Sequence, residues 1–170
     1  MINLGAKCGL DNLETIVHLD NLCSRLGIDC TSAASAIAFA MDLFERGILD
    51  ETETSGLALH WGDAKAMETL IHQMAAGEGL GGLLAQGVKR AAEAIGKDAH
   101  RYAAHVKGLE LTAYHPAAIL GSALGYAISS RGGDYNNVYA SLEYRWPEQQ
   151  AEAAFGSAEA VDSRRPAGKG

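Results

Sequence analysis

The chain has 170 residues, of which 48% are hydrophobic and only 6% aromatic, and its formal net charge is −7. This length suffices for one domain or parts of two, and an alanine-rich, aromatic-poor composition favours packed helices over a sheet sandwich. An acidic chain does not provide the basic face that sequence-independent nucleic-acid binding requires, so we expect no nucleic-acid partner.

Hydropathy and cysteine spacing exclude further classes of protein. No apolar run approaches the ~20 residues of a membrane span, and the N-terminus lacks the charged-then-apolar pattern of a signal peptide. The three cysteines, at positions 8, 23 and 30, are an odd number and include no CxxC pair. We therefore expect a soluble cytoplasmic protein without membrane contact, disulfide framework or self-contained zinc or iron–sulfur site.

Apolar residues at helical spacing predict two helices in the first part of the chain. Asp11 and Glu14 form a capping-box pattern before the first helix, which we expect to end at Gly27. Thr31 or Ser32 is the expected cap of the second helix.

The pattern continues with further short helices. Asp63 is expected to cap a third helix, which the glycines between 77 and 82 should break. A fourth helix is predicted over 82–95, and a short one near 98–105.

The second half of the chain is less regular. We expect 117–129 to form a helix rich in small residues, 130–139 a loop and 147–155 a weak helix. The segments near 57–61 and 108–112 read as extended and could pair. The prediction is therefore a mainly α fold of short-to-medium helices with at most a small two-stranded β element near those two segments.

The corner between the first two predicted helices contains the strongest candidate site. Asp29 could accept hydrogen bonds from a polar ligand at the mouth of the second helix, where unpaired backbone N–H groups create a positive end. The alternative is that Asp29 only caps the helix or makes a local turn bond. Cys23 and Cys30 flank it; buried packing is the default for Cys23, and a redox pair is the alternative.

Two histidines are candidates for proton transfer, although neither is assigned a catalytic role. His105 precedes the extended segment and His115 precedes Pro116. A histidine can move a proton near neutral pH, but a structural hydrogen bond is the alternative for both. The loop that begins at Arg131 contains two glycines and could approach a ligand, or be an ordinary loop.

Several stretches, in order along the chain, resemble the aldehyde:ferredoxin oxidoreductase family. They are CSRLGID at 23–29, AIAFAMDLFERGIL at 36–49, LHWGD at 59–63, EGLGGLLAQGVKRAAEAIG at 78–96, HVKGLELTAYHP at 105–116 and ALGYAISSRGG at 123–133. The resemblance implies oxidation of an aldehyde or related carbonyl with electron transfer to ferredoxin. It also implies a tungsten (or molybdenum) bis-pterin cofactor and a [4Fe–4S] cluster in the full-length enzyme. A branch that resembles this family serves in benzoyl-CoA reduction, and YNNVYASLEYRW could fit that branch.

The resemblance maps the family's DxxGLD motif onto residues 24–29. Gly27 and Asp29 match the motif, Ile28 takes the leucine position, and Ser24 replaces the leading aspartate. These four residues are the cofactor-binding candidates by resemblance, and Asp29 would accept from pterin ring N–H groups. No metal ligand is expected in this chain.

The resemblance also implies an organisation into domains. Residues 1–106 correspond to the later part of the family's first helical domain and 107–170 to the beginning of the second. The pterin-cradling β domain and the cluster's CxxCxxxC are not in the chain. We therefore expect an internal segment, inactive and without cofactor in isolation, that assembles with the remainder of the enzyme or as a homo-oligomer through its former interface. The alternative is a non-catalytic helical remnant that acts as a protein-interaction module.

Overall fold

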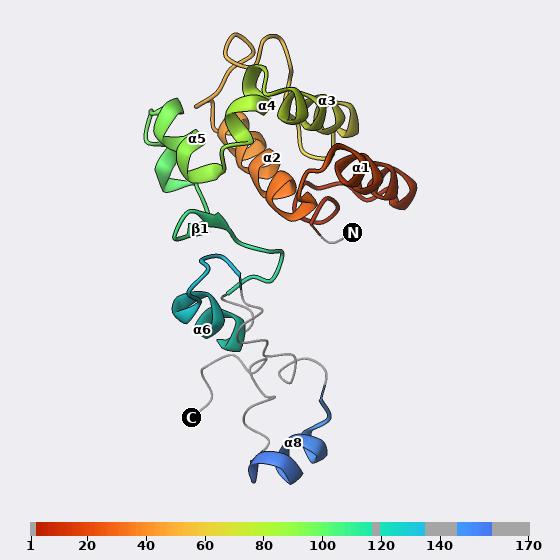
Figure 1. Cartoon of the computed structure of the whole chain (residues 1–170), viewed down its shortest axis with the longest axis vertical. Helices are drawn as coiled ribbons and strands as arrows, with labels where there is room; N and C mark the ends of the chain where they lie inside the picture. The colour runs from red at the N-terminus through yellow and green to blue at the C-terminus, as the bar shows by residue number, and fades with distance from the viewer. Residues whose placement is uncertain (1–2, 117–119, 135–145, 158–170) are drawn as a thin grey trace. The chain divides into compact units, whose positions relative to one another are not determined.

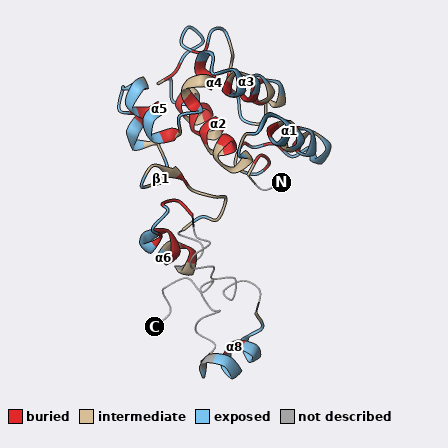
Figure 2. Ribbon diagram, in the orientation of Figure 1, coloured by how far each residue is buried: buried red, intermediate tan, exposed pale blue. Residues whose placement is uncertain are grey.

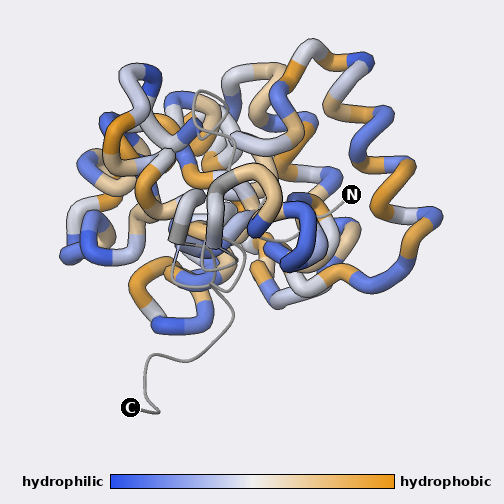
Figure 3. Tube along the Cα trace, turned by 90° about the horizontal axis from the view of Figure 1, so that it is seen from below, coloured by the Kyte–Doolittle hydropathy of each residue, from blue (hydrophilic) through white to orange (hydrophobic). Residues whose placement is uncertain are grey.

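The computed structural model describes residues 3–116, 120–134 and 146–157. The chain divides into two compact units, Met1–Ala113 and Tyr114–Gly170 (Figure 1). Hydrophobic and hydrophilic residues alternate at short intervals along the tube in Figure 3, as expected for helices with one buried face.

Helix α1, Leu13–Leu26, opens the first unit. Its cap is Asn12, whose Oδ1 accepts a hydrogen bond from the Thr15 N–H at 2.9 Å. The prediction of Asp11 is therefore wrong by one residue, because the side chain at position 12 is the one that reaches an unpaired N–H of the first turn. The predicted stop at Gly27 is confirmed: its φ of 71° is left-handed, which glycine adopts without steric cost.

Helix α2, Cys30–Glu45, is the centre of this unit and contacts α1, α3, α4, α5 and β2. Figure 2 shows buried and partly buried residues along this helix, and alanines on its surface let the neighbours approach closely. Asp29 caps it through the Thr31 N–H, so the prediction of Thr31 or Ser32 as the cap is wrong. No single helix in the described part of the chain could cross a membrane; α1 and α2, bent by 116°, pass the length and composition test only together.

The next helices pack on α2. Helix α3, Ala64–Ala76, is capped by Asp63 as predicted and ends at Gly77. The predicted helix over 82–95 is instead two helices, α4 (Gly79–Leu84) and α5 (Val88–Ile95). Gly87 separates the two helices because its φ of 91° and ψ of 153° are not helical. A short 3₁₀ turn, Ala99–Arg101, replaces the helix predicted near 98–105.

The β element is a local hairpin. Strand β1, His105–Val106, pairs antiparallel with β2, Leu109–Glu110. The prediction near 108–112 is thus confirmed by β2, whereas 57–61 is not a strand. Lys107 and Gly108 explain the difference, since both have positive φ, 54° and 91°, and form the tight two-residue turn that joins adjacent strands. The predicted mainly α fold is confirmed.

Apolar side chains from the helices of the first unit form one core. The most deeply buried are Leu19, Ile37, Met41, Leu43, Met67, Leu70, Ile71, Leu84 and Val88.

The second unit contains α6, Leu120–Ile128, and α8, Glu148–Phe155, which match the helices predicted over 117–129 and 147–155. Residues 117–119 and 135–139 of the predicted helix and loop lie outside the described residues. Arg131 pairs with Asp134 at 2.9 Å within its own loop.

Candidate functional site

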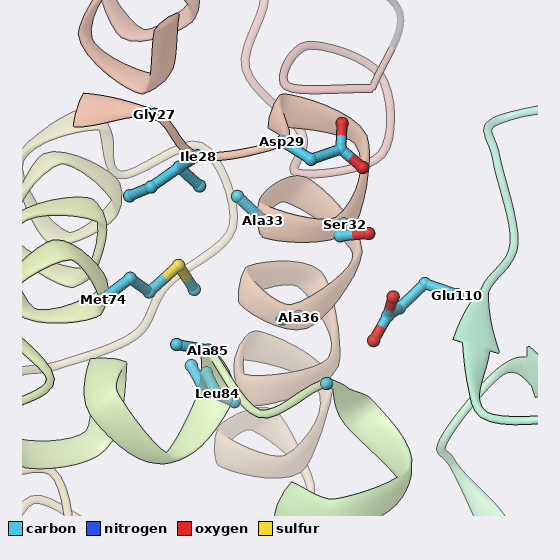
Figure 4. Close-up of a pocket in the computed structure, with 11 residues that line it drawn as sticks. Gly27, Ile28, Asp29, Ser32, Ala33, Ala36, Met74, Leu84, Ala85 and Glu110 are labelled. Atoms are coloured by element: carbon cyan, nitrogen blue, oxygen red, sulfur yellow. The ribbon is translucent and has the colours of Figure 1, made fainter. Parts of the chain in front are cut away.

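The corner between α1 and α2 forms one wall of a pocket with a volume of about 320 Å³ (Figure 4). That volume is at the lower end of the range of small-molecule sites. The corner, α2, the end of α3, the α4–α5 connection and β2 all contribute to the lining. The lining residues are Gly27, Ile28, Asp29, Ser32, Ala33, Ala36, Met74, Leu84, Ala85, Gly87 and Glu110.

Asp29 takes the capping role and also lines the pocket, while its role as a ligand acceptor stays a prediction. Its Oδ1 accepts the Thr31 N–H at 3.0 Å, so the residue does cap α2. It also lines the pocket, and its side chain is exposed. The cap occupies one carboxylate oxygen and fixes the orientation of the group, which leaves acceptor capacity for a ligand.

The other motif residues divide between the pocket and the helix end. Gly27 and Ile28 line the pocket, and the Ile28 N–H donates to the Cys23 carbonyl at 2.9 Å to close α1. Ser24 only contributes its carbonyl to the Gly27 N–H at 3.3 Å; its side chain is exposed and is not part of the lining. The structure thus brings three of the four predicted binding residues together.

Glu110 is a second acidic residue of the pocket lining, which the sequence pattern did not indicate as a binding residue. It is only 5% exposed, and its Oε1 accepts the Val88 N–H at the start of α5 at 2.8 Å. In the sequence it is a lone acid between Leu109 and Leu111 in an extended stretch, so alternation would place it on the face opposite the leucines. Nothing in that pattern indicates that this face is covered by another element.

Lys7 lies between the elements that form the two walls. Its Nζ donates to Ser35 Oγ on α2 and to the Leu111 carbonyl after β2, both at 2.6 Å. Burial lowers the pKa of the Lys7 ammonium, and the charges of Cys8, Glu110 and Asp29 partly oppose that shift. The half-buried ammonium of Lys7 therefore interacts with both carboxylates of the pocket.

The two histidine candidates are not part of the pocket. His105 Nδ1 accepts the Gly108 N–H at 3.3 Å, which is a structural hydrogen bond, the alternative to proton transfer. His115 belongs to the second unit and its side chain is exposed.

Cys8 and Cys23 are buried, whereas Cys30 is partly buried. All three are free, and burial raises the pKa of Cys8 to about 12 and that of Cys23 to about 11, so both stay protonated at neutral pH. The described residues contain no group of three or more His, Cys, Asp or Glu side chains arranged to hold a metal ion.

Comparison with known proteins assigns the family. Residues 1–166 match the family described as "Aldehyde ferredoxin oxidoreductase, domains 2 & 3". This match confirms the resemblance read from the ordered sequence stretches.

Curated relatives agree with that match. The chain is 36% identical over 161 residues, 91% of its length, to the aliphatic sulfonate oxidoreductase WOR-like subunit of Pyrococcus furiosus, of which the match covers 26%. It is 38% identical over 137 residues, 80% of the chain, to the tungsten-containing aldehyde ferredoxin oxidoreductase of the same organism, of which the match covers 22%. The corresponding enzyme of Thermococcus kodakarensis is 36% identical over 137 residues, with the same coverage. The chain spans about a quarter of the length of these relatives. The chain belongs to the aldehyde ferredoxin oxidoreductase family.

Proposed function

We propose that the chain is part of the helical body of a tungsten-pterin oxidoreductase that oxidises an aldehyde or related carbonyl and passes the electrons to ferredoxin. In this proposal the chain is inactive alone and holds one edge of a pterin. The observation that supports it is the position of Asp29, which stands at the N-terminus of α2 and lines the pocket within the DxxGLD-like corner.

The donor and acceptor chemistry of the pocket fits a pterin. A pterin ring presents amino and ring N–H donors on one edge, and the Asp29 carboxylate offers an acceptor for them. Ile28, Met74 and Leu84 provide apolar surface for a flat ring. Since no metal-ligand cluster exists among the described residues, the role proposed for this chain is to hold the pterin rather than the metal.

Each of these residues has a defined task in the proposal. The bound tungsten (or molybdenum) bis-pterin would supply the two-electron chemistry that converts the carbonyl substrate. Asp29 would orient the ring through its free acceptor capacity, while the Thr31 N–H holds the carboxylate in place. The apolar side chains would exclude water from the ring face.

The organisation and partners belong to the same proposal. Residues 1–106 would complete the first helical domain of the enzyme and 107–170 begin the second, with the [4Fe–4S] cluster in the remainder of the protein. Leu13 and Val17 on α1 are 60% and 44% exposed, which favours a contact with that remainder or with a second copy. The proposed location is the cytoplasm, where ferredoxin would accept the electrons.

The test is the metal and pterin content of the protein in which this chain is joined to the remainder of the enzyme. Elemental mass spectrometry should find tungsten or molybdenum, and oxidation should release a fluorescent pterin. Asp29→Asn, which keeps an oxygen for the Thr31 N–H, should lower the pterin content, whereas Asp11→Asn, at an exposed position outside the pocket, should not. A joined protein that contains neither metal nor pterin would contradict the proposal.

A non-catalytic interaction module is the second candidate function. The same exposed apolar side chains of α1 favour it, because a helix that presents Leu13 and Val17 to solvent can bind another protein surface. A chain that stays monomeric at high concentration and gains no stability from any partner would count against this candidate.

A further inference from the structure

We infer that Glu110 is a second carboxylate acceptor in the pocket, which selects a planar ligand group with several N–H donors on one edge, as in a 2-aminopyrimidin-4-one ring. This inference rests on the proposed function and deepens it. It assigns a binding role to a residue of β2, outside the α1–α2 corner that carries the family motif.

The carboxyl group of Glu110 belongs to a buried residue. A carboxylate that is 5% exposed loses most of its hydration and needs compensating hydrogen bonds or charges. The Val88 N–H compensates Oε1, helped by the positive N-terminus of α5. Among the described residues no hydrogen bond reaches Oε2, because the Nζ of Lys7 donates to Ser35 and Leu111 instead. Among the described residues, the fully buried polar atoms without a partner do not include Oε2, so this oxygen keeps contact with the open space of the pocket, where a ligand donor can bind.

The shape of the wall also favours a ligand. Figure 4 shows Glu110 extending from β2 toward the surface of α2 that carries Ser32 and Ala36. A Cβ at Gly87 would lie 2.9 Å from Glu110 Oε1, so a larger residue there would require the carboxylate to move. The small residues on both sides keep the space between the walls open.

The charges around the pocket favour a ligand with donors. Asp29 and Glu110 line the same pocket, and both interact with the half-buried ammonium of Lys7. Two carboxylate acceptors on the lining favour a neutral or cationic ligand edge rich in donors and disfavour a free phosphate or carboxylate. The absence of a third metal-ligating side chain nearby, within the residues described, favours an organic donor edge over a metal ion.

One conservative variant tests the contribution of Glu110 to ligand binding while it keeps the hydrogen bond to Val88. Glu110→Gln keeps an oxygen for the Val88 N–H but replaces the pocket-facing oxygen with a donor. The isolated chain is expected not to retain the complete bis-pterin cofactor, but a free ring at high concentration can still occupy the pocket. The probe is therefore pterin itself, 2-amino-4-oxopteridine, titrated into the chain and followed by its fluorescence. The variant loses the hydrogen bond between the carboxylate and the pterin N–H, and its amide NH2 instead faces that N–H donor. Pterin binding should therefore weaken about tenfold to 100-fold, while the melting temperature of the protein stays unchanged.

Two controls sharpen the result. Glu78→Gln changes an exposed glutamate that makes no capping bond and should bind pterin like the unaltered chain. Pteridine-2,4-dione, which lacks the 2-amino group, should bind the unaltered chain more weakly than pterin does, and Glu110→Gln should reduce that preference.

The outcomes distinguish this inference from the proposed function. Equal pterin affinity of the unaltered chain and Glu110→Gln, with Asp29→Asn weakened, would overturn the role of Glu110 alone. No pterin binding by the unaltered chain up to the solubility limit of the probe would also overturn it. The proposed function is tested separately, by the metal and pterin content of the joined protein.

Discussion

The two walls of the pocket are built in different ways. On one side, Asp29 is exposed and its capping bond spans two residues. On the other side, Glu110 is buried and its bond to the Val88 N–H spans 22 residues. The comparison teaches that a corner held by local bonds should tolerate change. The wall at β2 depends instead on long-range bonds, which are the Glu110–Val88 bond and the bonds from Lys7 and Ser35 to the Leu111 carbonyl.

The largest expected effect is the loss of the long-range bond. Glu110→Ala leaves the Val88 N–H without its acceptor and creates a cavity, which should lower the free energy of unfolding by about 2–4 kcal/mol. Urea denaturation followed by circular dichroism measures this. Glu78→Ala is the matched control and should cost less than about 0.5 kcal/mol. If both variants were equally stable, the two walls would not differ as described.

A second substitution, Gly87→Ala, should destabilise the wall that contains Glu110 by straining the backbone. Gly87→Ala must adopt a φ of 91° and place its Cβ 2.9 Å from Glu110 Oε1. Strain of this kind costs on the order of 1–3 kcal/mol, so thermal unfolding should show a clear decrease in melting temperature. The double variant Gly87→Ala/Glu110→Ala should lose less stability than the sum of the two single variants, because both substitutions act on one contact. A strictly additive result would count against that shared contact.

The local corner should respond more weakly. Asp29→Ala removes the cap of α2 and should cost about 1 kcal/mol, whereas Asp29→Asn keeps an acceptor for the Thr31 N–H and should leave stability nearly unchanged. Chemical denaturation of the two variants side by side tests this. A loss for Asp29→Asn as large as that for Asp29→Ala would show that the charge, and not the cap, stabilises the corner.

The smallest effect concerns Lys7, which joins the walls. Because burial lowers its pKa in the folded state below the unfolded value of 10.5, the unfolded chain binds more protons in the alkaline range just below 10.5. The Lys7 contribution to stability should therefore rise with pH through this window. The measurement is the stability of the unaltered chain minus that of Lys7→Met between pH 7 and 10.5, which cancels the titration of other groups. A difference that falls as the pH rises would contradict the expected direction.

Local patterns were sufficient for much of the helical framework. Asp63, Gly27 and Gly77 mark helix ends through short-range capping and left-handed backbone, and their positions follow from residue type alone. The family assignment likewise follows from ordered sequence stretches. The corner residues Gly27, Ile28 and Asp29 were therefore identified as a candidate site before any contact was known.

Other features could not be predicted because they depend on distant partners. The helical pattern over 82–95 gave no indication of the break at Gly87, whose backbone makes room for Glu110. The segment 57–61 alternates like a strand, yet β2 pairs with its immediate neighbour β1 because the two-residue turn at Lys107–Gly108 closes at little entropic cost.

Capping, helix ends and amphipathic spacing are local, since a few neighbouring residues satisfy the backbone and define the buried face; the sequence alone therefore determined the α1–α2 corner and the mainly helical fold. Which acid becomes buried is not a local property. Glu110 reads as one more acid in an extended stretch, and only packing of β2 near the start of α5 gives it a backbone donor and removes it from water. The tertiary structure alone decided that the pocket has a second carboxylate.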